Sequence, residues 1–196
     1  GILRGTTRPE EAVVISAHWD HFGIGEKENG DSIYNGAVDN GTSMAWALEI
    51  GEAFSSMKKR PERSVILFFP TAEEQGLLGS SWFVANPPVR QENLIACFNN
   101  DLLLPIGRMK DMMVTGYGQS DLDDMLAGAA SRQGRYLMPD PNPETGMYFR
   151  SDHFPFAKAG IPSMFARGNC DSREYGIEWA ADREKEYITN KYHKPA

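Results

Sequence analysis

The chain has 196 residues, 41% of them apolar, and its 20 Lys and Arg against 27 Asp and Glu give a formal net charge of −7. These values are typical of one soluble globular domain, which at this length buries a core without disulfides or a structural metal. The acidic balance argues against a nucleic-acid partner, and the apolar runs are too short for a membrane-spanning helix, which needs about 20 residues.

The amino terminus, Gly1-Ile2-Leu3, has neither an initiator Met nor an apolar signal segment. We therefore expect an excised or processed fragment of a longer precursor. Cys97 and Cys170 fit no metal-ligand spacing and no disulfide framework, so they do not identify the compartment.

Short β-rich runs alternate with helical patterns along the chain, which is typical of an α/β fold with a largely parallel sheet. Strands are predicted over residues 12–17, 64–69, 94–98, 112–115 and 162–166. Helices are predicted over residues 40–60, 77–85, 121–133, 152–159 and 177–189.

The best defined helix begins at Asn40, a good capping residue, and ends on the basic residues 58–60 before Pro61. Its expected apolar face carries Met44, Ala47, Leu48, Gly51 and Phe54. The proline-rich segment 138–146 and the charge-rich segment 167–191 are predicted at the surface, where they border a site or simply face solvent. Segment 167–191 is expected to form one wall of that site.

His18 and Asp20 follow the first predicted strand, and the spacing of two directs both side chains to one face. A zinc-bound imidazole usually donates its second ring N–H to a carboxylate, so His18 is a candidate ligand and Asp20 its supporting acceptor. Taken alone, the pair is more simply explained as a surface histidine at a strand end.

Further carboxylates occur in similar positions. Asp39 lies in a turn before the predicted helix, where it either caps the helix or bridges two metals. Glu73 and Glu74 follow the second strand, either as an acidic helix turn or as a general base next to a metal ligand. Asp101 follows the third strand. Because ligands bind beyond the carboxyl ends of parallel strands, this shared location predicts one site.

Motifs in the order seen here resemble the co-catalytic di-zinc aminopeptidases of peptidase clan MH, family twenty-eight, which include bacterial leucyl aminopeptidases. The motifs are Ser-Ala-His18-Trp-Asp20, Gly-Ala-Val-Asp39-Asn-Gly, Ala-Glu73-Glu74-Gln-Gly-Leu, Asn-Asn-Asp101-Leu, Tyr148-Phe-Arg-Ser-Asp152-His153 and Tyr192-His193-Lys-Pro. The resemblance implies that residues 1–196 form one zinc-peptidase catalytic domain, truncated at its carboxyl end. The implied fold is a three-layer α/β sandwich, with a mostly parallel, mixed central sheet and helices on both faces.

The resemblance also implies the roles of individual residues. His18 and Asp101 would bind one zinc ion, Glu74 and His193 the other, and Asp39 would bridge them. The same resemblance makes Glu73 the general base, Tyr148 the donor to the tetrahedral oxyanion, and Asp20, Asp152 and His153 supporting or structural residues. His21 receives no role.

The implied reaction is removal of the amino-terminal residue from a peptide with a free amino terminus, by a water that bridges the two metals. Zinc suits this ligand set, as cobalt or manganese would. A periplasmic or extracellular location is implied by the resemblance alone. Alternatives are a dipeptidase or carboxypeptidase of the same fold, a single-zinc glutaminyl cyclase relative, and a non-catalytic homologue; the oligomeric state is open.

Overall fold

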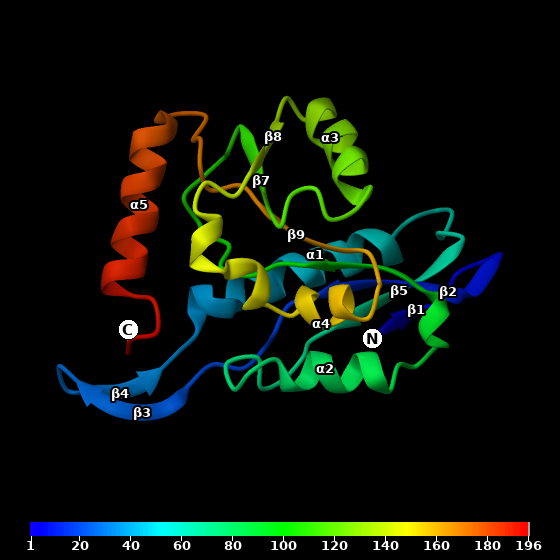
Figure 1. The fold of residues 1–196 in the computed structure, drawn as a ribbon, viewed down its shortest axis with the longest axis horizontal. Helices are drawn as coiled ribbons and strands as arrows, with labels where there is room; N and C mark the ends of the chain where they lie inside the picture. The colour runs from blue at the N-terminus through cyan, green and yellow to red at the C-terminus, as the bar shows by residue number, and fades with distance from the viewer. Residues whose placement is uncertain (196) are drawn as a thin grey trace.

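Seven strands form one mixed sheet in the computed structural model, which describes residues 1–195 (Figure 1). Their order across the sheet is β1 (Ile2–Leu3), β5 (Arg63–Phe68), β2 (Arg8–Ser16), β6 (Leu94–Asn99), β9 (Ser163–Arg167), β7 (Asp111–Thr115) and β8 (Tyr136–Pro139). Strands β5, β2, β6 and β9 run parallel, whereas β1 and β7 are antiparallel to β5 and β9. The largely parallel, mixed sheet is therefore confirmed.

Two buried cores lie on opposite faces of the sheet because successive strand residues point to opposite sides. Val14 of β2 packs with Phe83 and Phe156 on one face, whereas Ile15 packs with Ala47 on the other. Each large apolar side chain that is fully buried in this way stabilises the fold by about 2 kcal/mol.

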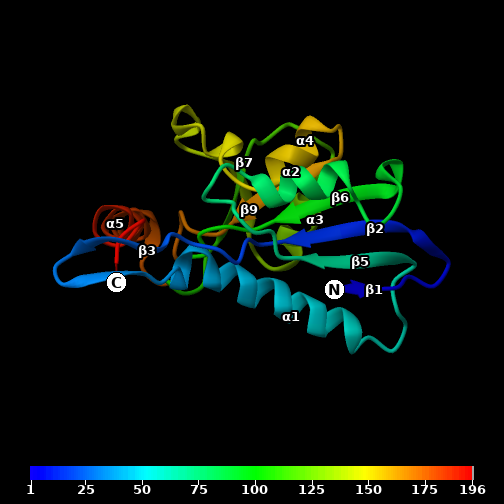
Figure 2. The same ribbon diagram turned by 90° about the horizontal axis from the view of Figure 1, so that it is seen from below.

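Helices cover both faces, as the predicted three-layer sandwich requires. The face that carries Val14 is covered by α2 (Leu78–Ala85) and α4 (His153–Lys158), which contact each other. The opposite face is covered by α1 (Ser43–Ser55) and α3 (Leu122–Arg132). Figure 2 shows α1 below the sheet and α2 and α4 above it.

A hairpin and a long helix lie beyond one end of the sheet. The hairpin consists of β3 (Gly23–Glu28) and β4 (Asp31–Tyr34), and both figures place it beside the carboxyl-terminal end of α5 (Gly176–Asn190). Short 3-10 turns cover Gln91–Asn93, Pro143–Thr145 and Met147–Phe149. No helix within residues 1–195 is both long and apolar enough to cross a membrane.

The best defined predicted helix differs from the sequence expectation at both ends. It begins at Ser43 because Asn40 has a non-helical backbone, and its side-chain amide donates to the Asn100 carbonyl at 3.2 Å instead of capping the helix. It ends at Ser55, where serine hydroxyls bond to carbonyls three residues earlier and compete with the helical backbone. Leu48 is 55% exposed and does not belong to the buried face.

The other predicted helices and strands are found, with their ends shifted by one residue or, in β2, by up to four. Strands β1, β3, β4 and β8 were not predicted. Strand β3 is exposed along its whole length, so it lacks the alternation of apolar and polar residues that identifies a half-buried strand. Strand β8 overlaps the start of segment 138–146, and the rest of that segment is largely exposed, as expected.

Candidate metal centre

The predicted site residues meet at one edge of the sheet. Parallel strands β2, β5 and β6 end there, and the segments that follow them carry His18, then Glu73 and Glu74, then Asp101. Asp39 reaches the same place from the irregular turn before α1. The shared location of these side chains, which the sequence predicts, is therefore present in the structure.

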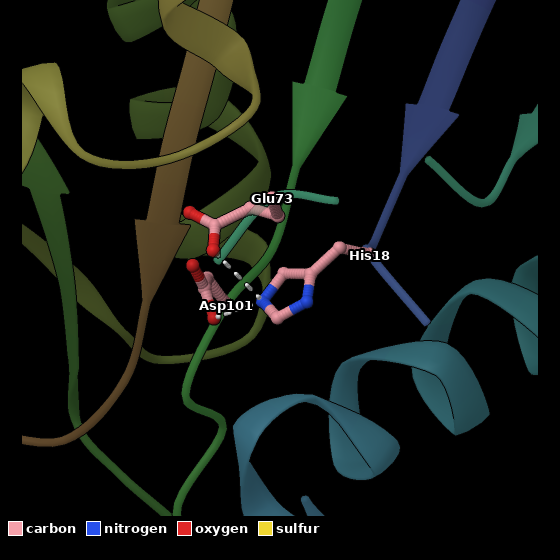
Figure 3. Close-up of side chains that lie close together, drawn as sticks. All are labelled: His18, Glu73 and Asp101. Atoms are coloured by element: carbon pink, nitrogen blue, oxygen red, sulfur yellow. Dashed lines mark ion pairs between the residues drawn. The ribbon is translucent and has the colours of Figure 1, made fainter. Parts of the chain in front are cut away.

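One group of donors surrounds His18, which is only 1% exposed. Its Nε2 atom lies 3.3 Å from Asp39 Oδ1, 3.4 Å from Asp101 Oδ1 and 3.9 Å from Glu73 Oε2. Figure 3 shows the imidazole of His18 facing the carboxylates of Glu73 and Asp101 from the neighbouring strand ends. Side-chain donors of these three residues lie close enough together to hold one metal ion.

A second group of donors lies on the other side of Asp39. His193 Nε2 is 3.3 Å from Asp39 Oδ2 and 3.4 Å from Glu74 Oε2. The other carboxylate oxygen of Glu74 lies 2.6 Å from His21 Nδ1. Asp39 therefore directs one oxygen to each group, which is the arrangement of a carboxylate shared between two metal ions.

Asp20 supports the site in a different way from the expected one. The Nδ1 atom of His18 lies 3.0 Å from the Asp20 carbonyl oxygen and 3.8 Å from its carboxylate, so the backbone carbonyl orients the ring. The Asp20 carboxylate instead accepts the backbone N–H groups of Glu73 and Glu74, at 3.2 and 3.4 Å. Asp20 thus connects the β2 segment to the segment that carries both glutamates.

Asp101 is held by buried polar side chains. Ser151 Oγ donates to Asp101 Oδ2 at 2.8 Å, and Asn99 Nδ2 donates to Ser151 Oγ at 2.7 Å. The other oxygen, Asp101 Oδ1, is buried and accepts no hydrogen bond within the part of the chain that the structure describes. Because a buried carboxylate oxygen is costly without a partner, this atom fits a metal ligand.

Backbone strain is concentrated beside these residues. Ala72, Leu77, Leu102 and His193 have φ between 53° and 60°, a region that non-glycine residues rarely adopt. Ala72 precedes Glu73, Leu77 lies three residues after Glu74, Leu102 follows Asp101, and His193 is itself a predicted ligand. Strained residues of this kind cluster at functional sites, where the surrounding structure fixes their geometry.

The electrostatics of the site favour a bound cation. Burial and the charge of Asp101 raise the pKa of Glu73 to about 9. Burial and the charge of Asp39 likewise raise the pKa of Glu74. Burial alone would lower the pKa of His18, but the nearby carboxylates of Asp101 and Asp39 outweigh it and raise the pKa to about 12. Crowded carboxylates next to histidine nitrogens are a donor set that suits zinc.

The motif that contains Tyr148 reaches the carboxylates through Ser151, whose hydroxyl donates to Asp101. Asp152 and His153 are fully buried, and burial raises the pKa of Asp152 to about 7 and lowers that of His153 to about 4. The His153 ring packs against Tyr148 and Phe165, with centroid distances of 5.0 and 5.4 Å. Within the described residues, no ion pair joins His153 to a proposed metal ligand, whereas His193 makes two.

Two features of the site were not predicted from the sequence. His21 contacts Glu74, and its position directly after Asp20 in the His-Trp-Asp-His motif was the available signal. Tyr192 stacks on the His193 ring at a centroid distance of 3.7 Å, and burial together with the charge of Asp39 raises the pKa of Tyr192. Its position beside a predicted ligand was the only hint of this contact.

A family model for peptidase family M28 matches residues 1–196. The chain belongs to peptidase family M28. Members of this family are metal-dependent peptidases, in agreement with the donor geometry. The leupeptin-inactivating enzyme 1 of Streptomyces exfoliatus is 33% identical over 134 residues, which cover 67% of this chain and 29% of that protein. Carboxypeptidase Q of Bos taurus is 30% identical over 107 residues, 54% of this chain and 21% of that protein.

Solved structures show the same fold. The LapA aminopeptidase of Legionella pneumophila matches with a TM-score of 0.65 and 25% identity, over 80% of this chain and 39% of that one. BSAP, a zinc aminopeptidase from Bacillus subtilis, matches with a TM-score of 0.62 and 22% identity, over 96% of this chain and 47% of that one. The M28 chain thus spans less than half the length of these relatives.

A cavity of about 720 Å³ adjoins the carboxylates of the M28 chain. Its acidic wall is formed by Asp39, Glu73, Glu74 and Asp101. Apolar side chains from around α2, α4 and the Met147–Phe149 turn line other parts, together with Arg150 and Lys158. Tyr192 and His193 line it as well, so this wall comes from the residues directly after segment 167–191, not from that segment as expected. Tyr148 is not among the lining residues.

Proposed function

We propose that the chain is the catalytic part of a two-zinc aminopeptidase. The observation that carries this proposal is the division of Asp39 between two donor groups. Asp39 Oδ1 faces His18, which also faces Asp101, and Asp39 Oδ2 faces His193, which also faces Glu74. Each group combines one imidazole with carboxylates, the mixture of nitrogen and oxygen donors typical of catalytic zinc sites.

Glu73 is the proposed general base. When bound, the zinc ions would polarise the scissile carbonyl and lower the pKa of a water molecule. Glu73 lies at the edge of the His18 group and lines the cavity, so its carboxylate can take a proton from the attacking water. It then gives this proton to the leaving nitrogen, which departs as an amine.

A donor to the oxyanion completes the proposed mechanism. The family resemblance implies that Tyr148 is this donor. Tyr192 is a second candidate, because it lies in the cavity wall. Either phenol would supply a hydrogen bond where negative charge develops, a contribution that is large when the donor is fixed in advance.

A carboxypeptidase or dipeptidase is the second candidate function. Arg150 and Lys158 line the cavity, and neither side chain makes an ion pair within residues 1–195. Two such cations would suit the terminal carboxylate of a substrate. The acidic wall instead favours an aminopeptidase, because its carboxylates would face the free ammonium group of a peptide.

We also propose, from the family resemblance, a periplasmic or extracellular location.

Two measurements test the proposal together: the metal content, and which end of a peptide must be free for hydrolysis. Elemental analysis after dialysis against zinc-supplemented and then zinc-free buffer is expected to give two zinc ions per chain. We expect hydrolysis of a leucyl peptide with an amidated carboxyl end, and none after acetylation of its amino end. Hydrolysis of an acetylated leucyl peptide with a free carboxyl end, and not of the amidated peptide, would instead indicate a carboxypeptidase. One zinc ion per chain or none would overturn the two-metal centre.

A further inference from the structure

A second cavity, of about 590 Å³, lies between α1, the segment 103–109, and the starts of β7 and β8. Four arginines line it: Arg108, Arg135, Arg167 and Arg173. None of them belongs to the proposed metal centre. We call this space the arginine cavity.

Backbone carbonyls fix the orientation of two of these guanidinium groups. Arg135 Nε donates to the Asp111 carbonyl at 3.0 Å, and Arg173 Nη2 donates to the Gln133 carbonyl at 2.7 Å. A neutral carbonyl orients a guanidinium but leaves its positive charge uncompensated, and each group retains further N–H donors. The two arginines are therefore held in place and remain available to an anion.

The nearby carboxylates are engaged with other groups. Asp111 is fully buried and accepts the backbone N–H groups of residues 169–171, and Asp171 pairs with Lys110 at 3.1 Å. Glu184 lies 3.9 Å from Arg167. Within residues 1–195, no ion pair involves Arg108, Arg135 or Arg173. Burial lowers the pKa of Arg135, and repulsion from Arg173 lowers it further against the opposing charge of Asp111.

Arg167 adds an almost fully buried guanidinium to the wall of the arginine cavity. Its side chain is only 7% exposed, and its Nη1 donates to the Asp101 carbonyl at 3.1 Å. Its Nε is buried and has no hydrogen-bond partner within the described residues. Because this nitrogen is closed to solvent, Arg167 contributes positive charge to the wall of the cavity and no accessible Nε donor.

The remaining lining of the arginine cavity is largely apolar and includes Trp46, Leu104 and Met112. Cationic and apolar surfaces thus face the same space. We propose that the arginine cavity binds a small organic anion, in which a phosphate or carboxylate group faces the arginines and an apolar part packs on the other wall. This site is independent of the proposed peptidase chemistry.

Isothermal titration calorimetry tests this proposal with three probes at constant ionic strength. Inorganic phosphate tests the anionic group alone, and phenyl phosphate and benzoate test the apolar part with either type of anionic group. The zinc-loaded protein is used with its metal centre blocked by an amino-acid hydroxamate, so that anions bound to the metal do not contribute heat.

Arg108 offers the sharpest variant, because its exposed side chain makes no hydrogen bond or ion pair within the described residues. We expect saturable one-to-one binding that Arg108→Gln weakens at least about tenfold and that Arg108→Glu abolishes, with unchanged melting temperatures. Arg4→Gln, an exposed arginine outside the cavity, serves as the matched control and should change the affinity less than about twofold.

The tighter of phenyl phosphate and benzoate identifies the anionic group, and tighter binding of phenyl phosphate than of phosphate supports the apolar wall. Heat that does not saturate with any probe would overturn the proposal. Equal losses of affinity in the Arg108→Gln and Arg4→Gln variants would also overturn the proposal, because they would show that the anions respond only to the overall charge of the protein.

Discussion

His21 and Glu74 form the shortest contact of the metal centre, with Nδ1 of the imidazole 2.6 Å from Oε1 of the carboxylate. Because an ionised carboxylate only accepts hydrogen bonds, the ring nitrogen donates. The contact fixes Glu74 so that its other oxygen, Oε2, faces His193 at 3.4 Å. His21 is thus a positioning residue for a proposed metal ligand.

We expect His21→Ala to weaken the affinity for the second zinc ion by about 10- to 100-fold, as the loss of an orienting partner usually does. His21→Asn should restore much of this affinity, since its amide can donate from nearly the same position. Zinc titration with a competing chelator measures both. Equal weakening in the two variants would show that His21 acts through packing against Phe22 and Tyr34 and not through its hydrogen bond.

His193 and His153 are the two histidines between which the sequence motifs had to choose. His193 Nε2 faces Asp39 and Glu74, whereas His153 is fully buried against Tyr148 and Phe165. We expect His193→Ala to lose about one zinc ion per chain, because it removes one of few ligands. His153→Ala should retain both ions but melt at a lower temperature, because it leaves a cavity in the core. Zinc loss from His153→Ala alone would reverse the assignment.

The location of this site could be predicted from the sequence, but parts of its geometry could not. His18, the glutamates and Asp101 each follow a recognisable buried strand, and parallel strands bring their carboxyl ends to one edge. The orientation of His18 by a carbonyl of Asp20, in contrast, depends on the path of the chain after β2. No periodic pattern encodes that path.

The same distinction explains the errors in the fold. Strands β2, β5 and β6 are predicted because burial on both faces gives them nearly continuous apolar runs. The hairpin of β3 and β4 lies outside the main sheet, with β3 exposed and β4 half-buried, so backbone pairing defines it without an apolar pattern. Tyr148 is a similar case: its ring occupies the space beside Gly116, where an added Cβ would lie 2.1 Å from it. Such a contact between distant segments has no local signature.

Glu73→Gln separates metal binding from proton transfer. We expect the variant to keep its zinc and to lose turnover by about 10²-fold or more, because the amide cannot accept the proton of the attacking water. Elemental analysis and steady-state kinetics on the same preparation measure the two quantities. Glu92→Gln, which removes an exposed carboxylate paired with Arg90, is the matched control and should leave both unchanged. Full turnover in Glu73→Gln would assign the base elsewhere.

Tyr148→Phe and Tyr192→Phe together identify the donor to the oxyanion. Removing one fixed donor of this kind typically lowers kcat by about 10²- to 10³-fold with little change in KM. Tyr192 lines the cavity and Tyr148 does not. If substrate binds without a rearrangement of the cavity wall, we therefore expect Tyr192→Phe to lower kcat more than Tyr148→Phe does. A larger loss in Tyr148→Phe would show that the family role of Tyr148 holds and that its segment moves toward the substrate.

Cys170 provides a prediction away from the site. Burial, together with the negative charge of Asp111, raises the pKa of its thiol from 9.0 to about 12. A raised pKa lowers the thiolate fraction at pH 8, and because only the thiolate reacts, alkylation should be about 10³-fold slower than for a thiol of unshifted pKa. Iodoacetamide labelling of the folded protein, read by mass spectrometry of the Cys170 peptide, measures the rate. The rate should rise about tenfold for each pH unit from 8 to 10, whereas a rate that levels off between pH 9 and 10, as for a thiol of pKa 9.0, would contradict the raised pKa.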